Sequence, residues 1–291
     1  MYILNIGSLN VDKVYGVEEF VRAGETIAAT SLNTYCGGKG LNQSVALSRA
    51  GASVRHAGLV GFDGQIILDE LTKNEINTSL IKMIDEPTGV AIIQVNAAGE
   101  NSIIVYGGAN KKIDETYIDY ALEGTTSGSM LVLQNEISNV PYAILRAKER
   151  GMKIALTPAP VTKELLSYPI ELVDYLLLNE TEGKALTGLK YGGGIELLEK
   201  LTNQYPNTNI ILTLGDKGAY FSQGKKQYFQ PSFEVEVVDT TGSGDTFCGY
   251  FLAEIVAGHT IEKAMEIASK AASICVTRKG AAASVPYRNE L

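Results

Sequence analysis

Residues 237–251 read Val-Val-Asp-Thr-Thr-Gly-Ser-Gly-Asp-Thr-Phe-Cys-Gly-Tyr-Phe, and within this stretch a strand-like pattern gives way to a helical one. Upstream, Phe233, Val235 and Val237 alternate with two glutamates, which is the period of a half-buried strand. Downstream, apolar side chains recur at helical spacing, at Phe247, Tyr250, Phe251 and Ile255. The sequence therefore predicts a strand over 233–237, a glycine-rich turn, and a helix that begins near Gly242.

The turn formed by Gly242, Ser243 and Gly244 is suited to an anion. The first N–H groups of a helix lack intrahelical partners and carry partial positive charge, and small residues let a ligand approach them. Asp245 follows directly. An anion repels a carboxylate, yet a carboxylate there can take the proton of a hydroxyl group that attacks phosphorus. Asp245 is equally explained as an acid that only stabilises the first helical turn, so the local pattern leaves both interpretations open.

Composition excludes several classes of protein. The 291 residues carry a formal net charge of -8 with a pI near 5.0, which argues against a broad nucleic-acid or anionic-membrane surface. No run is long enough for a membrane-spanning helix, and the N-terminus lacks the features of a signal peptide, so we expect a cytoplasmic protein. Cys36, Cys248 and Cys275 have no patterned spacing and, with only two histidines, predict free thiols rather than a zinc site.

Strand and helix patterns alternate along most of the chain, which predicts a mostly parallel sheet with helices on both faces. Strands are expected over residues 2–6, 54–60, 130–133, 153–157 and 172–178, and the last helix from Ile261. Two β-rich regions, about 13–36 and 88–108, can build a small sheet that covers a cleft. No repeat or low-complexity linker divides the chain, so we expect one domain over 1–291 with this sheet as a lid.

Polar residues follow several of the predicted strands. Asn10 and Asp12 follow the first, and further clusters lie at 134–136, 179–182 and 213–218. Each cluster alone is typical of a turn, but together they predict a shared cleft at the carboxyl edge of the sheet. The segment 36–44 places three glycines around Lys39 without the spacing of the common phosphate loop.

Four of these stretches together resemble the ribokinase (PfkB) family of carbohydrate kinases: 38–42, 179–182, 213–218 and 239–245. The resemblance covers nearly the whole chain in order, and several ordered motifs are more specific than one glycine pattern. Within the family, the chain is most similar to the ribokinases through the runs at 37–43, 99–101 and 276–280. The resemblance implies an α/β fold, a three-layer α/β/α sandwich with a mostly parallel central sheet and a small β-sheet lid.

The same resemblance implies transfer of the ATP γ-phosphoryl group to a sugar hydroxyl, O5 of D-ribose in ribokinases, with Mg²⁺ bound to the nucleotide. Asp245 would be the catalytic base, and the amides of Gly242, Ser243, Gly244 and Asp245 would form the anion hole. Because the transition state of phosphoryl transfer is loose, most of the rate would come from positioning and charge stabilisation.

The ligand-binding residues that the resemblance implies fall into three sets. The sugar would be bound by Asn10, Asp12, Gly38, Lys39, Gly40, Asn42, Glu136 and Asp245. ATP would lie along Asn179, Glu182, Thr213, Gly215, Gly218, Gly244 and Ser269, with Glu182 acting through Mg²⁺ and its waters. A monovalent-cation site for activation by K⁺ would be formed by Asp239, Thr241, Cys275, Arg278, Gly280 and Ser284. Because lids in the family often pair, a homodimer through the lid is expected.

Three positions depart from the family pattern and leave the sugar open. Ser243 stands where alanine is usual, Leu41 replaces a common alanine, and Ser269 stands where ribokinases often have asparagine. One alternative is therefore a kinase for deoxyribose, another sugar or a nucleoside, and a second is a sugar- or nucleotide-binding regulator without catalysis. A dinucleotide-dependent oxidoreductase is disfavoured, because no Gly-x-Gly-x-x-Gly follows the first strand.

Overall fold

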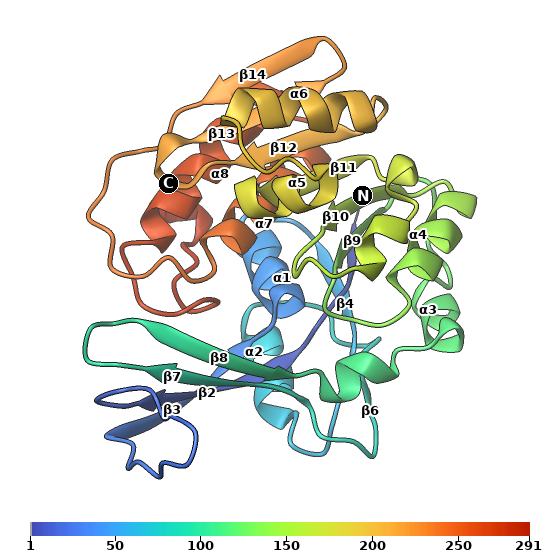
Figure 1. Cartoon of the computed structure of the whole chain (residues 1–291). Helices are drawn as coiled ribbons and strands as arrows, with labels where there is room; N and C mark the ends of the chain where they lie inside the picture. Colours follow the sequence, from blue (N-terminus) through green and yellow to red (C-terminus); the bar gives the residue numbers. More distant parts are fainter. Residues whose placement is uncertain (1) are drawn as a thin grey trace.

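The core of the molecule is an eight-stranded sheet with the strand order β14-β13-β12-β11-β10-β9-β1-β4 (Figure 1). The computed structural model describes residues 2–291. Six neighbouring strands, β4, β1, β9, β10, β11 and β12, run parallel. β13 and β14 are added antiparallel at one edge, so the prediction of a mostly parallel sheet is confirmed. The strands are β1 (Ile3–Ile6), β4 (Val54–Ala57), β9 (Met130–Gln134), β10 (Lys153–Thr157), β11 (Tyr175–Asn179), β12 (Asn209–Thr213), β13 (Ala219–Gln223) and β14 (Lys226–Gln230).

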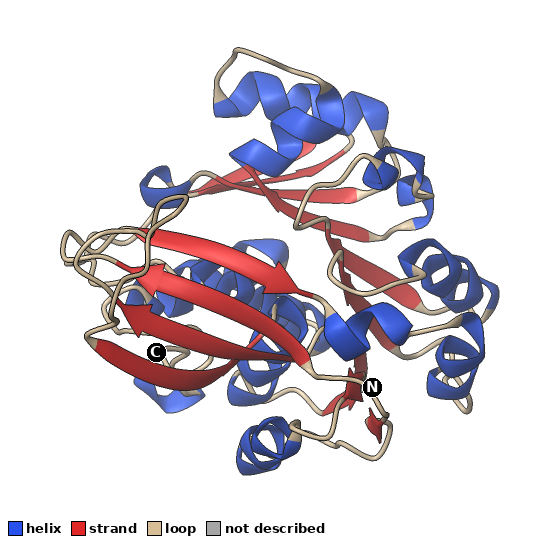
Figure 2. Ribbon diagram, turned by 60° about the horizontal axis from the view of Figure 1, so that its bottom comes forward, coloured by secondary structure: helices blue, strands red, loops and turns tan. Residues whose placement is uncertain are grey.

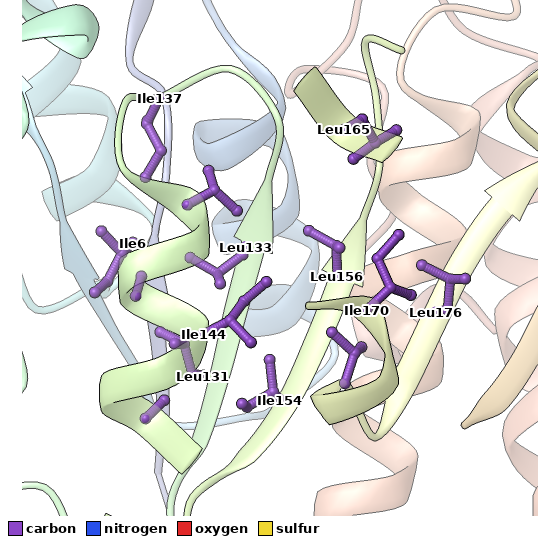
Figure 3. Close-up of a cluster of buried hydrophobic side chains, with 14 of the residues drawn as sticks. Ile6, Leu131, Leu133, Ile137, Ile144, Ile154, Leu156, Leu165, Ile170 and Leu176 are labelled. Atoms are coloured by element: carbon purple, nitrogen blue, oxygen red, sulfur yellow. The ribbon is translucent and has the colours of Figure 1, made fainter. Parts of the chain in front are cut away.

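Helices cover both faces of this sheet, which confirms the three predicted layers (Figure 2). Alternate strand residues face opposite sides, so Leu131 and Leu133 join one hydrophobic core and Met130 and Val132 join the other. The first core, part of which is drawn in Figure 3, packs against α3 (Glu115–Ala121), α4 (Val140–Glu149), α5 (Glu180–Thr187) and α6 (Gly194–Gln204). The second packs against α1 (Lys39–Arg49), α2 (Gln65–Lys73), α7 (Ser243–Val256) and α8 (Ile261–Cys275).

A second, four-stranded sheet has the order β3-β2-β7-β8 and stands apart from the main sheet (Figures 1 and 2). We call it the small sheet. Its strands are β2 (Asn10–Gly16), β3 (Ser31–Gly37), β7 (Gly89–Val95) and β8 (Asn101–Tyr106). The predicted hairpin is present, because β7 and β8 pair antiparallel. Since only residues 7–9 separate β1 from β2, the chain runs directly from one sheet into the other.

The remaining elements are short. β5 (Leu59–Val60) pairs with β6 (Lys82–Met83), and 3-10 helices lie at η1 (Gly108–Lys112), η2 (Glu164–Ser167), η3 (Ile170–Leu172), η4 (Gly215–Lys217) and η5 (Arg288–Glu290). Over residues 2–291, no helix is both long enough and apolar enough to cross a membrane. The three cysteines are free thiols, as predicted.

Two predicted strands are wrong. The segment 233–237 follows β14 without strand pairing; β14 is the edge strand of the sheet, and Pro231 has no N–H to extend its ladder. The segment 54–60 is not one strand, because the chain leaves the main sheet after β4. At Gly58 the carbonyl accepts from the hydroxyl of Tyr117 at 2.8 Å and from the N–H of Lys82 at 3.2 Å instead.

Candidate active site

The turn that was predicted to bind an anion lies at the start of α7. Gly242 precedes the helix with a φ of 77°, in the left-handed region that favours glycine, and a Cβ there would lie 2.9 Å from the facing loop. The N–H of Ser243 donates to the carbonyl of Thr240 at 3.3 Å. Within residues 2–291, the N–H groups of Gly244 and Asp245 have no protein acceptor. These two amides are therefore free to bind an anion.

Asp245 lies in the first turn of α7 and is 7% exposed. Both of its carboxylate oxygens accept from side-chain amides of α1. Asn42 Nδ2 donates to Oδ2 at 3.0 Å, and Gln43 Nε2 donates to Oδ1 at 3.0 Å. The two contacts stabilise the ionised carboxylate and fix its plane. A residue that only stabilised its own helix would need neither.

The starts of α1 and α7 meet because small residues line the contact. Gly249 of α7 lies against α1 so closely that a Cβ would be 2.4 Å from Cβ of Ala46. Gly40 of α1 lies equally close to the loop after β1, where a Cβ would be 2.4 Å from the N of Ser8. Because these glycines allow close packing, the 37–43 segment lies next to the 242–245 turn.

Of the predicted sugar-binding residues, Asn42 contacts Asp245, and Lys39 and Asp12 lie near Glu136. Glu136 follows β9 and accepts from the N–H of Lys39 at 2.9 Å and from the hydroxyl of Ser8. Asp12 lies on β2, and Gly37 leaves room for its carboxylate, since a Cβ there would be 2.0 Å from Oδ2. Within residues 2–291, buried oxygens of Asp12 and Asn42 have no hydrogen-bond partner, so both are available to a ligand.

Asn10 and Gly38 help to fix the structure around this region. Asn10 Oδ1 accepts from Asn110 Nδ2 at 2.8 Å, and Gly38 precedes α1 with a φ of 91°. The sequence patterns missed Ser8 and Asn110. Ser8 shared a loop with a predicted residue and could have been suspected, whereas Asn110 is 100 positions from Asn10 and gave no local signal.

Burial and neighbouring charge alter proton affinities in the site. Burial, together with the charge of Glu136, raises the pKa of Asp12 to about 7. The charge of Asp245 raises the pKa of Lys39, so its ammonium group stays charged beside the carboxylate. Burial raises the pKa of Glu182, which lies near both. The site therefore holds one cation among several carboxylates, and a polyanionic ligand needs further cations or backbone amides.

Two adjoining cavities lie at the start of α7. The smaller, of about 220 Å³, is lined by Lys39, Asn179, Glu182, Thr213 and Asp245 among others. The larger, of about 560 Å³, is lined by Gly215, Gly218, Ser269 and the 233–237 segment. Gly244 and Thr213 line both cavities. All the residues expected to bind ATP thus line one of them, and the apolar wall from Phe233 to Val237 was missed because its alternation suggested a strand.

Asn179 and Glu182 are tied to each other. Asn179 caps α5, with its side chain accepting from the N–H of Glu182 at 2.9 Å, while Glu182 accepts from the N–H of Asn179 at 2.9 Å. This reciprocal capping box fixes the Glu182 carboxylate at the cavity wall. A carboxylate is a preferred Mg²⁺ ligand, directly or through water.

Two loops predicted to bind a cation are joined through Asp239. Its carboxylate accepts from the N–H and hydroxyl of Thr241 at 2.9 and 2.7 Å and from the N–H of Gly280 at 2.9 Å. Cys275 Sγ lies 3.0 Å from the hydroxyl of Ser284. The guanidinium of Arg278 pairs with Glu290, so only the backbone of Arg278 is free for a cation. The loops lie beside the 242–245 turn.

Known proteins share the sequence pattern and the fold of this chain. Residues 2–288 match the pfkB family of carbohydrate kinases. The chain is 37% identical to a ribokinase of Bacillus subtilis, over 98% of the chain and 96% of that protein. It is 36% identical to a deoxyribokinase of Salmonella typhi, with the same two coverages. The structure of Arabidopsis thaliana ribokinase complexed with ribose and ATP superposes with a TM-score of 0.87, at 30% identity over 99% of this chain and 96% of that chain.

Proposed function

This chain belongs to the pfkB family of carbohydrate kinases and is an ATP-dependent sugar kinase, and we propose that it transfers the γ-phosphoryl group of MgATP to O5 of D-ribose. The observation that carries the proposal is the position of Asp245. A buried carboxylate, held at both oxygens, lies one residue from backbone amides without a protein acceptor. A binding protein that did no chemistry would have no use for a base beside an anion site.

In the proposed reaction, Asp245 orients the ribose hydroxyl in line with the γ-phosphorus and accepts its proton late. The amides of Gly244 and Asp245, with Gly242 and Ser243 completing the turn, bind the charge that spreads over the transferring phosphoryl oxygens. Lys39 adds a positive charge at the same place. Positioning and charge stabilisation supply most of the rate, as a loose transition state requires.

The sugar and the nucleotide would enter from opposite sides of Asp245. Asp12, Asn42 and Glu136 offer oxygens to ribose hydroxyls, and Asn10, Gly38 and Gly40 shape the pocket. The larger cavity is lined by the apolar side chains of Phe233, Val235 and Val237, which suit an adenine ring, and Ser269 lines it as well. Glu182 would hold the Mg²⁺ of MgATP through water.

The cation loops fit a hard monovalent cation. Asp239, Ser284 and the carbonyls of Thr241 and Gly280 offer oxygen ligands, which K⁺ prefers. A bound K⁺ would fix the loop that faces Gly242, where glycine already packs at 2.9 Å. It would act by shaping the anion-binding turn.

The small sheet would close over the sugar as a lid formed by about 13–36 and 88–108, because Asn10 and Asp12 lie at its junction with the main sheet. Two such sheets would pair in a homodimer.

A deoxyribose kinase is the second candidate, favoured by the 36% identity to the deoxyribokinase. Deoxyribose lacks the 2-hydroxyl, so a pocket that hydrogen-bonds this group discriminates strongly against it. The mechanism would be unchanged.

The test measures ADP release from MgATP with ribose, deoxyribose, fructose or adenosine, in K⁺ or in a large organic cation, with Asp245→Asn alongside. We expect the fastest turnover with ribose, stimulation by K⁺, and a loss in the variant of about two to four orders of magnitude. Turnover only with another acceptor would replace the substrate. Equal rates in both cations would remove the K⁺ site, and an active Asp245→Asn would refute the base.

A further inference from the structure

A chain of buried side-chain amides lies behind Asp245. Gln43, which donates to Asp245, accepts at Oε1 from Gln134 Nε2 at 2.7 Å. Gln134 Nε2 also donates to Asn5 Oδ1 at 3.1 Å. Gln43, Gln134 and Asn5 are fully buried, and none of them lines either cavity. The three side chains come from α1, β9 and β1, so they connect the base to two neighbouring strands of the main sheet.

A backbone carbonyl sets the direction of this amide relay. Asn5 Nδ2 donates to the carbonyl of Gly40 at 2.8 Å, and a carbonyl can only accept. The side-chain oxygen of Asn5 therefore faces Gln134 and accepts a hydrogen bond, and Gln134 must donate it from its NH₂ group. The second hydrogen of that group points to Gln43, whose nearer atom must then be oxygen. The NH₂ group of Gln43 is left to face the carboxylate.

The far end of the relay is fixed in the same way. Asn5 Nδ2 also donates to Ser44 Oγ at 2.8 Å, and this hydroxyl lies 2.8 Å from His56 Nδ1. The other ring nitrogen, Nε2, lies 3.3 Å from the carbonyl of Gly7, so it carries the hydrogen and Nδ1 accepts from Ser44. Burial lowers the pKa of His56 to about 4, which keeps the ring neutral at physiological pH.

We propose that Gln43 is a positioning residue for the catalytic base, and that Gln134 and Asn5 hold its amide in the donating orientation. The proposal rests on the function proposed for Asp245. Asn42 restrains one carboxylate oxygen and Gln43 the other, so the plane of the carboxylate is fixed toward the acceptor hydroxyl. Without the second restraint the carboxylate rotates about its bond to Cβ, and fewer bound complexes have the geometry for proton transfer.

Methionine variants test the relay, because methionine matches glutamine in length and cannot donate. We expect Gln43→Met to lower kcat about ten- to hundred-fold, the loss expected for a hydrogen bond to a charged group, with KM for ribose and MgATP within about twofold. Gln134→Met should lower kcat in the same way, although it touches neither Asp245 nor a cavity. The double variant should be no slower than Gln43→Met, because Gln134 acts only through Gln43.

Two controls separate positioning from stability and from the proposed base. Ser222 of β13 is buried, accepts from Thr202 Oγ1 at 2.9 Å and lines neither cavity, so Ser222→Ala should lower the unfolding temperature and leave kcat unchanged. If Asp245→Asn is inactive while folded Gln43→Met keeps full kcat, the relay is refuted and the base stands. The relay would also be refuted if the fold-losses in kcat of Gln43→Met and Gln134→Met multiplied in the double variant. An active Asp245→Asn would instead refute the function on which the proposal rests.

Discussion

Asp12 lowers the stability of the folded protein while it offers a carboxylate oxygen to a ligand. Asp12 is half-buried, one of its carboxylate oxygens is buried without a partner within residues 2–291, and the charge of Glu136 acts on it. Folding therefore raises the pKa of Asp12 to about 7, well above the value of about 4 in an unfolded chain. Between these values the folded state binds more protons than the unfolded state, so the free energy of unfolding falls as pH rises from about 4 to about 7.

Replacing Asp12 should consequently stabilise the free protein at high pH. We expect Asp12→Asn to raise the unfolding midpoint by several degrees at pH 8 and by much less at pH 4, where Asp12 is protonated in the folded state and about half protonated in the unfolded state. The variant should also raise KM for ribose about tenfold or more, because an amide replaces a charged acceptor. Thermal unfolding across this pH range and ribose kinetics at pH 8 measure both effects.

Asp85 provides the matched control, because its side chain is exposed and lies outside the site. Asp85→Asn should give the same small difference in midpoint at pH 4 and pH 8. A midpoint for Asp12→Asn that differs from wild type equally at both pH values would contradict the role assigned to burial.

Local patterns in the sequence predicted the parts of the site that are close along the chain. The Gly242 turn and Asp245 depend on a helix start, which a few neighbouring residues specify, whereas residues 179–182 were predicted only as a polar cluster after a strand. The partners of Asp245 could not be predicted in this way. Gln43 and Asn42 lie about 200 positions from it in the chain, and only the packing of α1 on α7 brings them together.

The crossing of α1 and α7 is therefore the contact between elements on which the site depends. A Cβ at Gly249 would lie 2.4 Å from Cβ of Ala46 and 2.8 Å from the backbone N of Leu47. We expect Gly249→Ala to lower the free energy of unfolding by roughly 1–3 kcal/mol through overpacking, despite the better helix propensity of alanine. It should also lower kcat, because the separation of the helices moves Asp245 from Asn42. Denaturant unfolding and ADP release measure the two effects.

Gly128→Ala is the control for this substitution. Gly128 is exposed, and a Cβ there would meet its nearest atom only at 3.9 Å. We expect no loss of stability or of kcat. A Gly249→Ala protein as stable and active as wild type would mean that the two helices can separate without affecting the site.

Across the whole molecule, the alternation of strands and helices predicted the layered main sheet because buried parallel strands have distinctive apolar runs. The same reasoning failed at 233–237, where Phe233, Val235 and Val237 line the larger cavity. Alternation reports which side chains face an apolar surface, and the wall of a ligand cavity presents such a surface as well as a sheet does. The sheet ends at β14 because no further strand pairs with it among residues 2–291, and the pattern of apolar residues does not show which strands pair.

The small sheet has an open edge that a second copy of the chain could cover. Among residues 2–291, β8 pairs only with β7, and its apolar side chains Ile103, Ile104, Val105 and Tyr106 are 51–64% exposed. An apolar, unpaired edge strand favours association with another strand or sheet.

We therefore expect light scattering of the wild-type protein to give twice the 31.2 kDa mass of one chain. The Ile104→Lys variant should give the mass of one chain, because a buried lysine without a partner opposes association. Leu166→Lys is the matched control: Leu166 is as exposed as Ile104, at 64%, but lies in η2 on the main body, so it should leave the dimer intact. A single-chain mass for the wild-type protein at micromolar concentration would refute the dimer, and a dimer that survives Ile104→Lys would place its interface elsewhere. If the dimer also supports the lid, ribose KM should rise on dilution below its dissociation constant, which coupled assays at a series of protein concentrations would detect.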